Sequence, residues 1–401
     1  MKKKTALISF LGKSRINQDG LYREATYQLA TGEQETSRLI GLTLANHLRP
    51  DKLVILGTPG SMWDLLLAEE LALNANEAEI CRVIDATRDD CVNNAELAPF
   101  EQLLSDHLGM EASLLIIPYG RNAAEQQTIV EIMAHAVEGC DRVHIDVTHG
   151  LRHLPMVAFA AAQLMQQLHG KTIEGLHYGA LELTEGGVTP VLALDGLLLI
   201  DRWVKALHTF DKDGDYGVFV PLLEGLVEPV AVEQLRKAAF LERINNVRQA
   251  RGQLRGLLKH LENKTFVQPI EKLFMPALKE RIAWALAGRL GERQIQLAGH
   301  YLSNNDYIRA VLLAWEALIT HETAAAGGDS EAYSDRDQTN VLLKEDPDLK
   351  KQYRVLRNLR NALAHGESSS LKEVQQLVYS EERLRDYLQE FLAELSTHIC
   401  G

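Results

Sequence analysis

The fold of the first half of the chain is decided by the stretch RVHIDVTHGLRH, residues 142–153. Its apolar and β-branched first part predicts a strand over 142–147, followed by a turn and a helix. In a sheet of parallel strands such a turn lies at the carboxyl edge, where ligands bind. Free N–H groups of the helical turn, the close approach that Gly150 permits and the guanidinium of Arg152 suit a phosphate. The simpler alternative is a capped helix start with Thr148 as N-cap.

Short apolar runs alternate with longer amphipathic segments from residue 4 to about residue 210, a pattern typical of a parallel sheet covered by helices. The segments 173–183 and 188–194 flank a glycine turn and predict an antiparallel hairpin at the sheet edge. We therefore expect a Rossmann-like domain. The predicted parallel strands are 5–11, 53–56, 80–84, 113–117 and 142–147.

A polar, glycine-rich segment at 211–217 ends the strand pattern, and residue 232 onward is almost entirely helical in pattern. We expect one long loop, at 324–348. The fold class is thus α/β followed by all-α, with a Rossmann-like domain at 1–215, a helical connector at 216–290 and a helical domain at 291–401. The predicted helices are 235–261, 267–290, 292–302, 307–323, 353–364 and 371–398.

The composition excludes several classes of protein. The chain has 401 residues, and its 42 basic and 55 acidic side chains give a net charge of −13, which disfavours a wholly basic nucleic-acid-coating surface. Four widely spaced cysteines without a C-x-x-C pair argue against a zinc ribbon or a disulfide framework, and favour a cytoplasmic location. No apolar run approaches the ~20 residues of a membrane span. No Walker or dinucleotide motif follows a strand.

Three more loops at the expected carboxyl edge carry small and polar residues: GKS at 12–14, GTPGSMWD at 57–64 and PYGRN at 118–122. Each loop alone reads as a helix start, with Ser61 and Asp64, or Asn122 and Glu125, as capping pairs. Together with the turn at 146–152, these make four loops that face one crevice, and they predict an anion-binding surface at its base. The three histidines of 144–153 belong to a strand, a loop and a helix, so we expect no metal site there.

The last quarter of the chain contains YRVLRNLRNALAHG, residues 353–366, whose apolar positions form one stripe of a helix. Arg360 and His365 are five residues apart and cannot point the same way on a continuous helix. Either the helix ends near His365, with Gly366 as its C-terminal cap, or the two groups meet through a partner chain. The plain alternative is a solvated Arg360 and a His365 that favours the helix dipole. Functionally, the pair suffices for metal-free RNA cleavage by attack of the 2′-hydroxyl.

Together the two halves resemble the CRISPR-associated ancillary ribonucleases of type III systems, which join a CARF domain (CRISPR-associated Rossmann fold) to a helical HEPN domain. DVTHGLR at 146–152 resembles the acidic-x-Thr-x-Gly turn of CARF domains, and RNALAH at 360–365 matches the R-x-x-x-x-H motif of HEPN domains. The resemblance covers residues 1–210 and 290–401, and 220–290 carries no motif of the family.

The resemblance implies a cyclic oligoadenylate, foremost cyclic tetra-adenylate, as the activator, with no metal or other cofactor. It implies a homodimer that cleaves single-stranded RNA to 2′,3′-cyclic phosphate and 5′-hydroxyl ends, with assembly beyond a dimer left open. The expected catalytic residues are Arg360, His365 and Asn361, and the expected RNA-binding residues are Arg354, Arg357 and Lys351. The expected activator-binding residues are Gly12, Ser14, Thr58, Ser61, Arg121, Thr148, His149, Gly150 and Arg152.

Two alternatives stay open. One is a non-catalytic cyclic-nucleotide sensor whose helical half binds a partner or nucleic acid. The other adds a ring nuclease activity, in which Thr58, Ser61 or Thr148 positions the 2′-hydroxyls of the activator.

Overall fold

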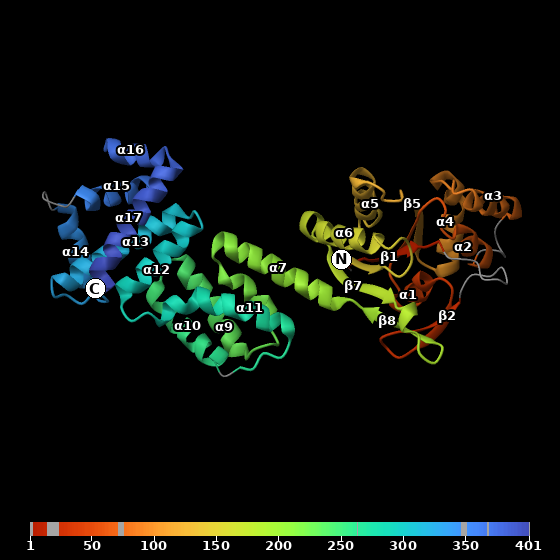
Figure 1. The fold of residues 1–401 in the computed structure, drawn as a ribbon, viewed down its shortest axis with the longest axis horizontal. Helices are drawn as coiled ribbons and strands as arrows, with labels where there is room; N and C mark the ends of the chain where they lie inside the picture. Colours follow the sequence, from red (N-terminus) through yellow and green to blue (C-terminus); the bar gives the residue numbers. More distant parts are fainter. Residues whose placement is uncertain are drawn as a thin grey trace. The chain divides into compact units, whose positions relative to one another are not determined.

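The computed structural model describes residues 3–13, 24–70, 76–262, 264–345, 351–366 and 369–400. Ser14, one of the expected activator-binding residues, lies outside these ranges. The chain divides into two compact units, Met1–Leu198 and Leu199–Gly401, which we call the N-terminal and the C-terminal unit (Figure 1). Each unit is described by itself below.

The N-terminal unit is built on a sheet whose described strands have the order β3-β2-β8-β7-β6-β1-β4-β5. The strands β1, β4, β5, β6 and β7 run parallel, which confirms the predicted Rossmann-like sheet. The strands are β1 (Thr5–Leu11), β2 (Ala25–Gln28), β3 (Gln34–Ser37), β4 (Lys52–Gly57), β5 (Glu111–Ile116), β6 (Arg142–Asp146), β7 (Thr172–Gly179) and β8 (Val188–Ala193).

Helices cover both faces of this sheet because its central strands are apolar on both sides. Leu7 and Leu11 of β1 pack into one core with α1 to α4, whereas Ile8 and Phe10 pack into a second core with α5 and α6. Figure 1 shows α5 and α6 together, apart from α2, α3 and α4. The helices are α1 (Ile40–Leu48), α2 (Trp63–Glu70), α3 (Glu77–Arg88), α4 (Asn94–Leu108), α5 (Ala123–Ala136) and α6 (Leu154–His169).

Two strand predictions are corrected by the structure. Residues 80–84 lie in α3, because Ile80 and Val83 are the buried stripe of a helix capped by Asn76. The hairpin of β7 and β8 is antiparallel as expected, but β2 pairs parallel with β8, so the hairpin is not the sheet edge. β7 also ends earlier than predicted, and residues 181–183 form a 3₁₀ turn.

The C-terminal unit is helical, as predicted, with four local differences. The helix expected at 267–290 ends at Ile282 and is followed by a 3₁₀ turn, Ala283–Leu286. The helix expected at 371–398 is divided into Lys372–Val378 and Glu381–Cys400. The helix expected at 235–261 is divided into α9 and α10, between which Asn245 adopts a left-handed φ of 57°. The loop expected at 324–348 contains α14, so that prediction is wrong. The helices are α7 (Asp195–Asp213), α8 (Val220–Leu223), α9 (Pro229–Arg243), α10 (Val247–Glu262), α11 (Pro269–Ile282), α12 (Leu290–Ser303), α13 (Tyr307–Ala325), α14 (Tyr333–Glu345), α15 (Lys351–His365), α16 (Lys372–Val378) and α17 (Glu381–Cys400).

One hydrophobic core runs through the whole C-terminal unit. Phe219, Leu254 and Leu278 from residues 216–290 belong to the same buried cluster as Leu297 and Leu356 from residues 291–401. The expected connector therefore packs into the core of the expected third domain. Within the described residues, no helix is both long enough and apolar enough to cross a membrane.

Candidate functional site

The strand order reverses between β1 and β6, the kind of switch point at which open α/β sheets form a crevice at the carboxyl edge. From β1 the chain moves to β4 and β5 on one side, and then returns to β6 on the other side of β1. Ligands bind at such a switch point in open α/β sheets. A Cβ atom built on Gly12, after β1, would lie 2.9 Å from the Gly150 amide nitrogen, after β6. Met62, after β4, donates to the Gly12 carbonyl at 2.9 Å. Three of the four predicted loops therefore meet.

Asp146 organises the turn after β6. It is fully buried, and its Oδ2 accepts a hydrogen bond from Ser9 Oγ on β1 at 2.6 Å. Its Oδ1 accepts from the Thr148 amide at 3.0 Å and from Thr148 Oγ1 at 2.6 Å. Thr148 Oγ1 in turn accepts from the Gly179 amide at 2.7 Å, so the turn is tied to both neighbouring strands. Thr148 is therefore not the helix N-cap, a position that His153 occupies without a side-chain hydrogen bond.

His149 and Gly150 follow in the same turn. Burial lowers the pKa of His149 and outweighs the opposing charge of Asp146, which keeps the imidazole neutral at pH 7. Its Nε2 is buried and has no hydrogen-bond partner among the described residues. Gly150 has a φ of +107°, a conformation that residues with a side chain rarely adopt. The turn thus contains the buried, unpaired Nε2 of His149 next to Gly150, a position at which a residue with a side chain would be strained.

Thr58 and Ser61 shape the loop after β4. Both are buried, at 5% and 2% exposure, and their hydroxyls lie 3.1 Å apart in hydrogen-bonding contact. Ser61 Oγ also accepts from the Thr58 amide at 2.9 Å. Trp63 Nε1 donates to the Thr58 carbonyl at 2.9 Å. These hydroxyls therefore hold the loop together, and a direct contact with a ligand stays a prediction.

Two guanidinium groups remain open at this edge. Arg152 is exposed and has no hydrogen bond or ion pair with the residues that the structure describes. Arg121 is exposed and lies 4.5 Å from the centre of the Tyr119 ring. The ring nitrogen Nε2 of His153 contacts the Tyr119 carbonyl at 2.9 Å, which connects the loops after β5 and β6. The Lys13 ammonium, in contrast, is paired with Asp90 at 2.7 Å.

The histidines of this region have separate partners. His144 Nδ1 lies 3.1 Å from His177 Nε2, whereas His153 contacts a carbonyl of another loop. Nowhere in the described ranges do three or more His, Cys, Asp or Glu side chains come together in a way that could hold a metal ion.

In the C-terminal unit, α15 carries the expected catalytic residues. Gly366 follows it with a φ of +64°, as predicted for the C-terminal cap. Arg360 is half-buried, its Nη1 donates to Asn361 Oδ1 at 3.0 Å, and its Nε is buried without a partner among the described residues. His365 is exposed and is still helical, so the helix continues through both functional positions. The two side chains of one chain therefore diverge.

The predicted RNA-binding residues have different surroundings. The Lys351 ammonium is exposed and lies 3.0 Å from Glu373 Oε2. Arg357 Nη1 donates to the Lys344 carbonyl at the end of α14 at 2.9 Å. Arg354 is exposed on α15. All three side chains therefore already have interactions within the chain.

Sequence reasoning missed Ser9 and Gly179, which hold the turn in place. Ser9 lies opposite Asp146 in the register of β1 and β6. A serine inside an otherwise apolar strand, level with an aspartate at the end of another strand, was the available signal.

Comparison with known proteins agrees with this geometry. Residues 6–182 match the family model described as the CARF domain of the CRISPR system endoribonuclease Csx1. Over these residues the N-terminal unit is thus similar to the CARF domain of Csx1.

The chain is also similar to the CRISPR-associated protein MJ1674 of Methanocaldococcus jannaschii, with 24% identity over 398 residues. The match covers 90% of this chain and 62% of that relative, so the chain spans about three fifths of the relative's length. Together, the two findings support a CRISPR-linked protein with a CARF sensing domain.

Proposed function

We propose that this protein is a cyclic oligoadenylate-activated, metal-independent endoribonuclease of CRISPR defence. In this proposal the CARF domain binds the activator, foremost cyclic tetra-adenylate, and the C-terminal unit cleaves single-stranded RNA in the manner of HEPN domains. The observation that carries the proposal is the contact of Gly12 with Gly150 at the switch point of a sheet that matches a CARF family model.

The chemistry of the crevice supports an anionic ring as the ligand. Arg121 and Arg152 offer open guanidinium groups, which bind phosphate oxygens in a bidentate manner.

Cleavage follows from the residue types at 360–365. His365 accepts the proton of the 2′-hydroxyl as its oxygen attacks the adjacent phosphorus, and the 5′-oxygen leaves with a proton supplied by a second imidazole or by water. Arg360 stabilises the negative charge that grows on the phosphoryl oxygens. Asn361 positions Arg360 through their 3.0 Å hydrogen bond. The products are a 2′,3′-cyclic phosphate and a 5′-hydroxyl.

A homodimer completes this site. Positions 360 and 365 differ by five steps of about 100°, so one helix points them roughly 140° apart. A second copy related by a two-fold axis brings the Arg360 of one chain toward the His365 of the other. The same symmetry suits a ring with two-fold symmetry, so one activator serves two chains.

The proposal is tested with a labelled single-stranded RNA incubated in EDTA, with and without cyclic tetra-adenylate. We expect activator-dependent cleavage, products with 2′,3′-cyclic phosphate ends, and a rate lowered about 10²–10⁴-fold in Arg360→Ala or His365→Ala. Arg236→Ala, on the surface of α9, is the control variant. Full activator-dependent cleavage by His365→Ala would refute the catalytic assignment. Absence of RNA cleavage with every cyclic oligoadenylate would leave the sensor alternative.

A further inference from the structure

The helix α10 carries a row of basic side chains in the part of the chain that has no family motif. Of its charged side chains, four are basic, and the single acidic one is its last residue, Glu262. Arg248, Arg251 and Arg255 follow one another at spacings of three and four residues, so they share one face. The buried residues of α10 form an adjacent face, which packs into the core of the unit. In a chain with a net charge of −13, such a basic face is a local exception.

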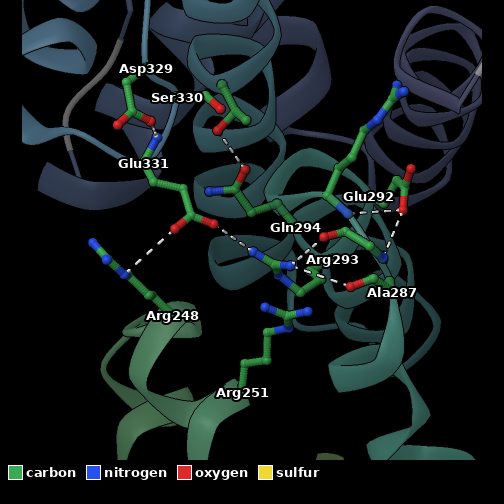
Figure 2. Close-up of polar contacts among 12 residues, drawn as sticks. Arg248, Arg251, Ala287, Glu292, Arg293, Gln294, Asp329, Ser330 and Glu331 are labelled. Atoms are coloured by element: carbon green, nitrogen blue, oxygen red, sulfur yellow. Dashed lines mark hydrogen bonds and ion pairs between the residues drawn. The ribbon is translucent and has the colours of Figure 1, made fainter.

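This basic face continues into a buried arginine of α12. Arg293 is only 1% exposed, and its Nη1 donates to the Gly288 carbonyl at 2.9 Å. Its Nε is buried with no partner among the described residues. Figure 2 shows Arg251 projecting from α10 toward Arg293. Burial, and next the charge of Arg251, lowers the pKa of Arg293, which reflects two cations held close together.

One carboxylate lies among these guanidinium groups. Glu331, in the segment between α13 and α14, places Oε1 3.2 Å from Arg293 Nη2 and Oε2 3.7 Å from Arg248 Nε (Figure 2). The Glu331 side chain is 42% exposed and that of Arg248 is 70% exposed, so solvent reaches this position. Glu292 also acts on Arg293, more weakly than Glu331, and two carboxylates do not balance three arginines. The cluster therefore resembles an anion-binding site in which the Glu331 carboxylate takes the position of the bound anion.

We propose that Arg248, Arg251 and Arg255, together with Arg293, bind the phosphodiester backbone of the RNA substrate, and that a phosphate displaces Glu331. This inference rests on the proposed function for the identity of the ligand as RNA. It adds a docking surface on α10 that is separate in sequence from the cleavage motif at 360–365. A straight row of cations along a helix suits a linear polyanion better than a compact ring.

The test measures binding of a fluorescent, 2′-O-methylated single-stranded RNA, which cannot be cleaved, to the full chain between about 50 and 200 mM salt. We expect Arg248→Ala/Arg251→Ala to weaken binding about tenfold. Loss of two phosphate contacts should also reduce the slope of log K against log salt by about 1.4. Glu331→Gln should tighten binding about threefold, because it removes the competing charge without changing the size of the side chain.

Matched variants separate binding from folding. Arg251 Nε also donates to the Ala285 carbonyl at 3.1 Å, so Arg248→Ala/Arg255→Ala is a second double variant that keeps this bond. The control is Arg236→Ala, which removes an exposed arginine paired with Glu224 and Glu233. We expect the second double variant to lose affinity and the control to keep it. Unchanged affinity and salt slope in both double variants, or no tightening by Glu331→Gln, would overturn the proposal.

The outcome also separates this inference from the proposed function. If the wild-type protein cleaves RNA but RNA affinity does not depend on the arginines, the docking surface is refuted and the proposed nuclease function is retained. If binding depends on the arginines but no RNA is cleaved, the docking surface stands and the nuclease is refuted. Labelled cyclic tetra-adenylate should bind equally to all variants, whereas lost ring binding in the double variants would assign the arginines to the activator and overturn the proposal.

Discussion

Replacing Asp146 tests whether its hydrogen bonds hold the turn that we propose as part of the activator-binding site. In the structure Asp146 accepts three hydrogen bonds: from Ser9 Oγ at 2.6 Å, from the Thr148 amide at 3.0 Å and from Thr148 Oγ1 at 2.6 Å. Asp146→Ala removes both acceptor oxygens, and with them all three hydrogen bonds, and leaves a buried space. Asp146→Asn keeps the size of the side chain and one acceptor oxygen for Thr148, while its amide group faces Ser9 Oγ.

The two changes should differ in size. A buried donor left without a partner lowers the free energy of unfolding by about 1–3 kcal/mol. Two of the three donors are hydroxyls, which can turn toward other acceptors. We therefore expect Asp146→Ala to lower the free energy of unfolding by about 3–5 kcal/mol. Asp146→Asn should cost about 1–2 kcal/mol, because one favourable contact is weakened rather than removed. For a unit of this size 1 kcal/mol shifts the melting temperature by about 2–4 °C. We therefore expect decreases of about 6–20 °C and about 2–8 °C.

Scanning calorimetry of the full chain measures both values, and added cyclic tetra-adenylate identifies the transition of the CARF domain, because a bound ligand raises it. Titration calorimetry should show that Asp146→Ala loses more activator affinity than Asp146→Asn. Melting of Asp146→Ala at the wild-type temperature, or equal effects of the two variants, would refute the role we give to this carboxylate.

Three further predictions concern the crevice, pH and the dimer. Gly12→Ala should weaken activator binding at least about tenfold, because the added Cβ would lie 2.9 Å from the Gly150 amide nitrogen. Gly196→Ala is the control, because its Cβ would meet open space and should leave the affinity unchanged. Equal affinities of the two variants in a binding assay would contradict this prediction. Burial and the neighbouring His177 lower the pKa of His144 to about 4 from 6.5, so its contribution to stability should be complete above pH 6.5 and decline as pH falls toward 4. His144→Asn should flatten that part of the melting-temperature profile, and an unchanged profile would exclude His144 as the cause. Mixing the inactive variants Arg360→Ala and His365→Ala should restore some RNA cleavage, because a mixed dimer holds one Arg360 opposite one His365. A mixture as inactive as its two components would argue against a site shared between two chains.

The central part of the fold was predictable because its strands are apolar on both faces. The runs at β1 and β4 are apolar at consecutive positions, as expected for buried parallel strands. The strand β3, in contrast, consists of Gln34, Glu35, Thr36 and Ser37 at the end of the sheet, where one face and one edge stay polar. Such a strand has no apolar pattern for sequence reasoning to detect.

The missed helices have a similar cause. The helix α14 buries only Thr339 and Leu343, so its pattern resembled a polar loop. The short apolar run at 80–84 was taken for a strand because four or five residues do not distinguish period 2 from period 3.6. The capping side chain of Asn76 would have favoured the helix.

The convergence of the loops could be inferred because parallel strands present their carboxyl ends at one edge. The internal partners of those loops could not. The pairing of Ser9 with Asp146 depends on the register of β1 against β6, and that of Lys13 with Asp90 on how the loops pack. The local sequence offers Thr148 as an N-cap in the simpler alternative, but its hydroxyl accepts a hydrogen bond from the Gly179 amide on β7 instead.

The most direct test of the account is a titration of the protein with cyclic tetra-adenylate in EDTA, with ring binding and RNA cleavage measured in the same samples. We predict that the cleavage rate rises with bound ring and saturates at about one ring per two chains. The His365→Ala variant should bind the ring equally well and cleave almost no RNA. Cleavage that is independent of the ring, or that persists in His365→Ala, would contradict the account.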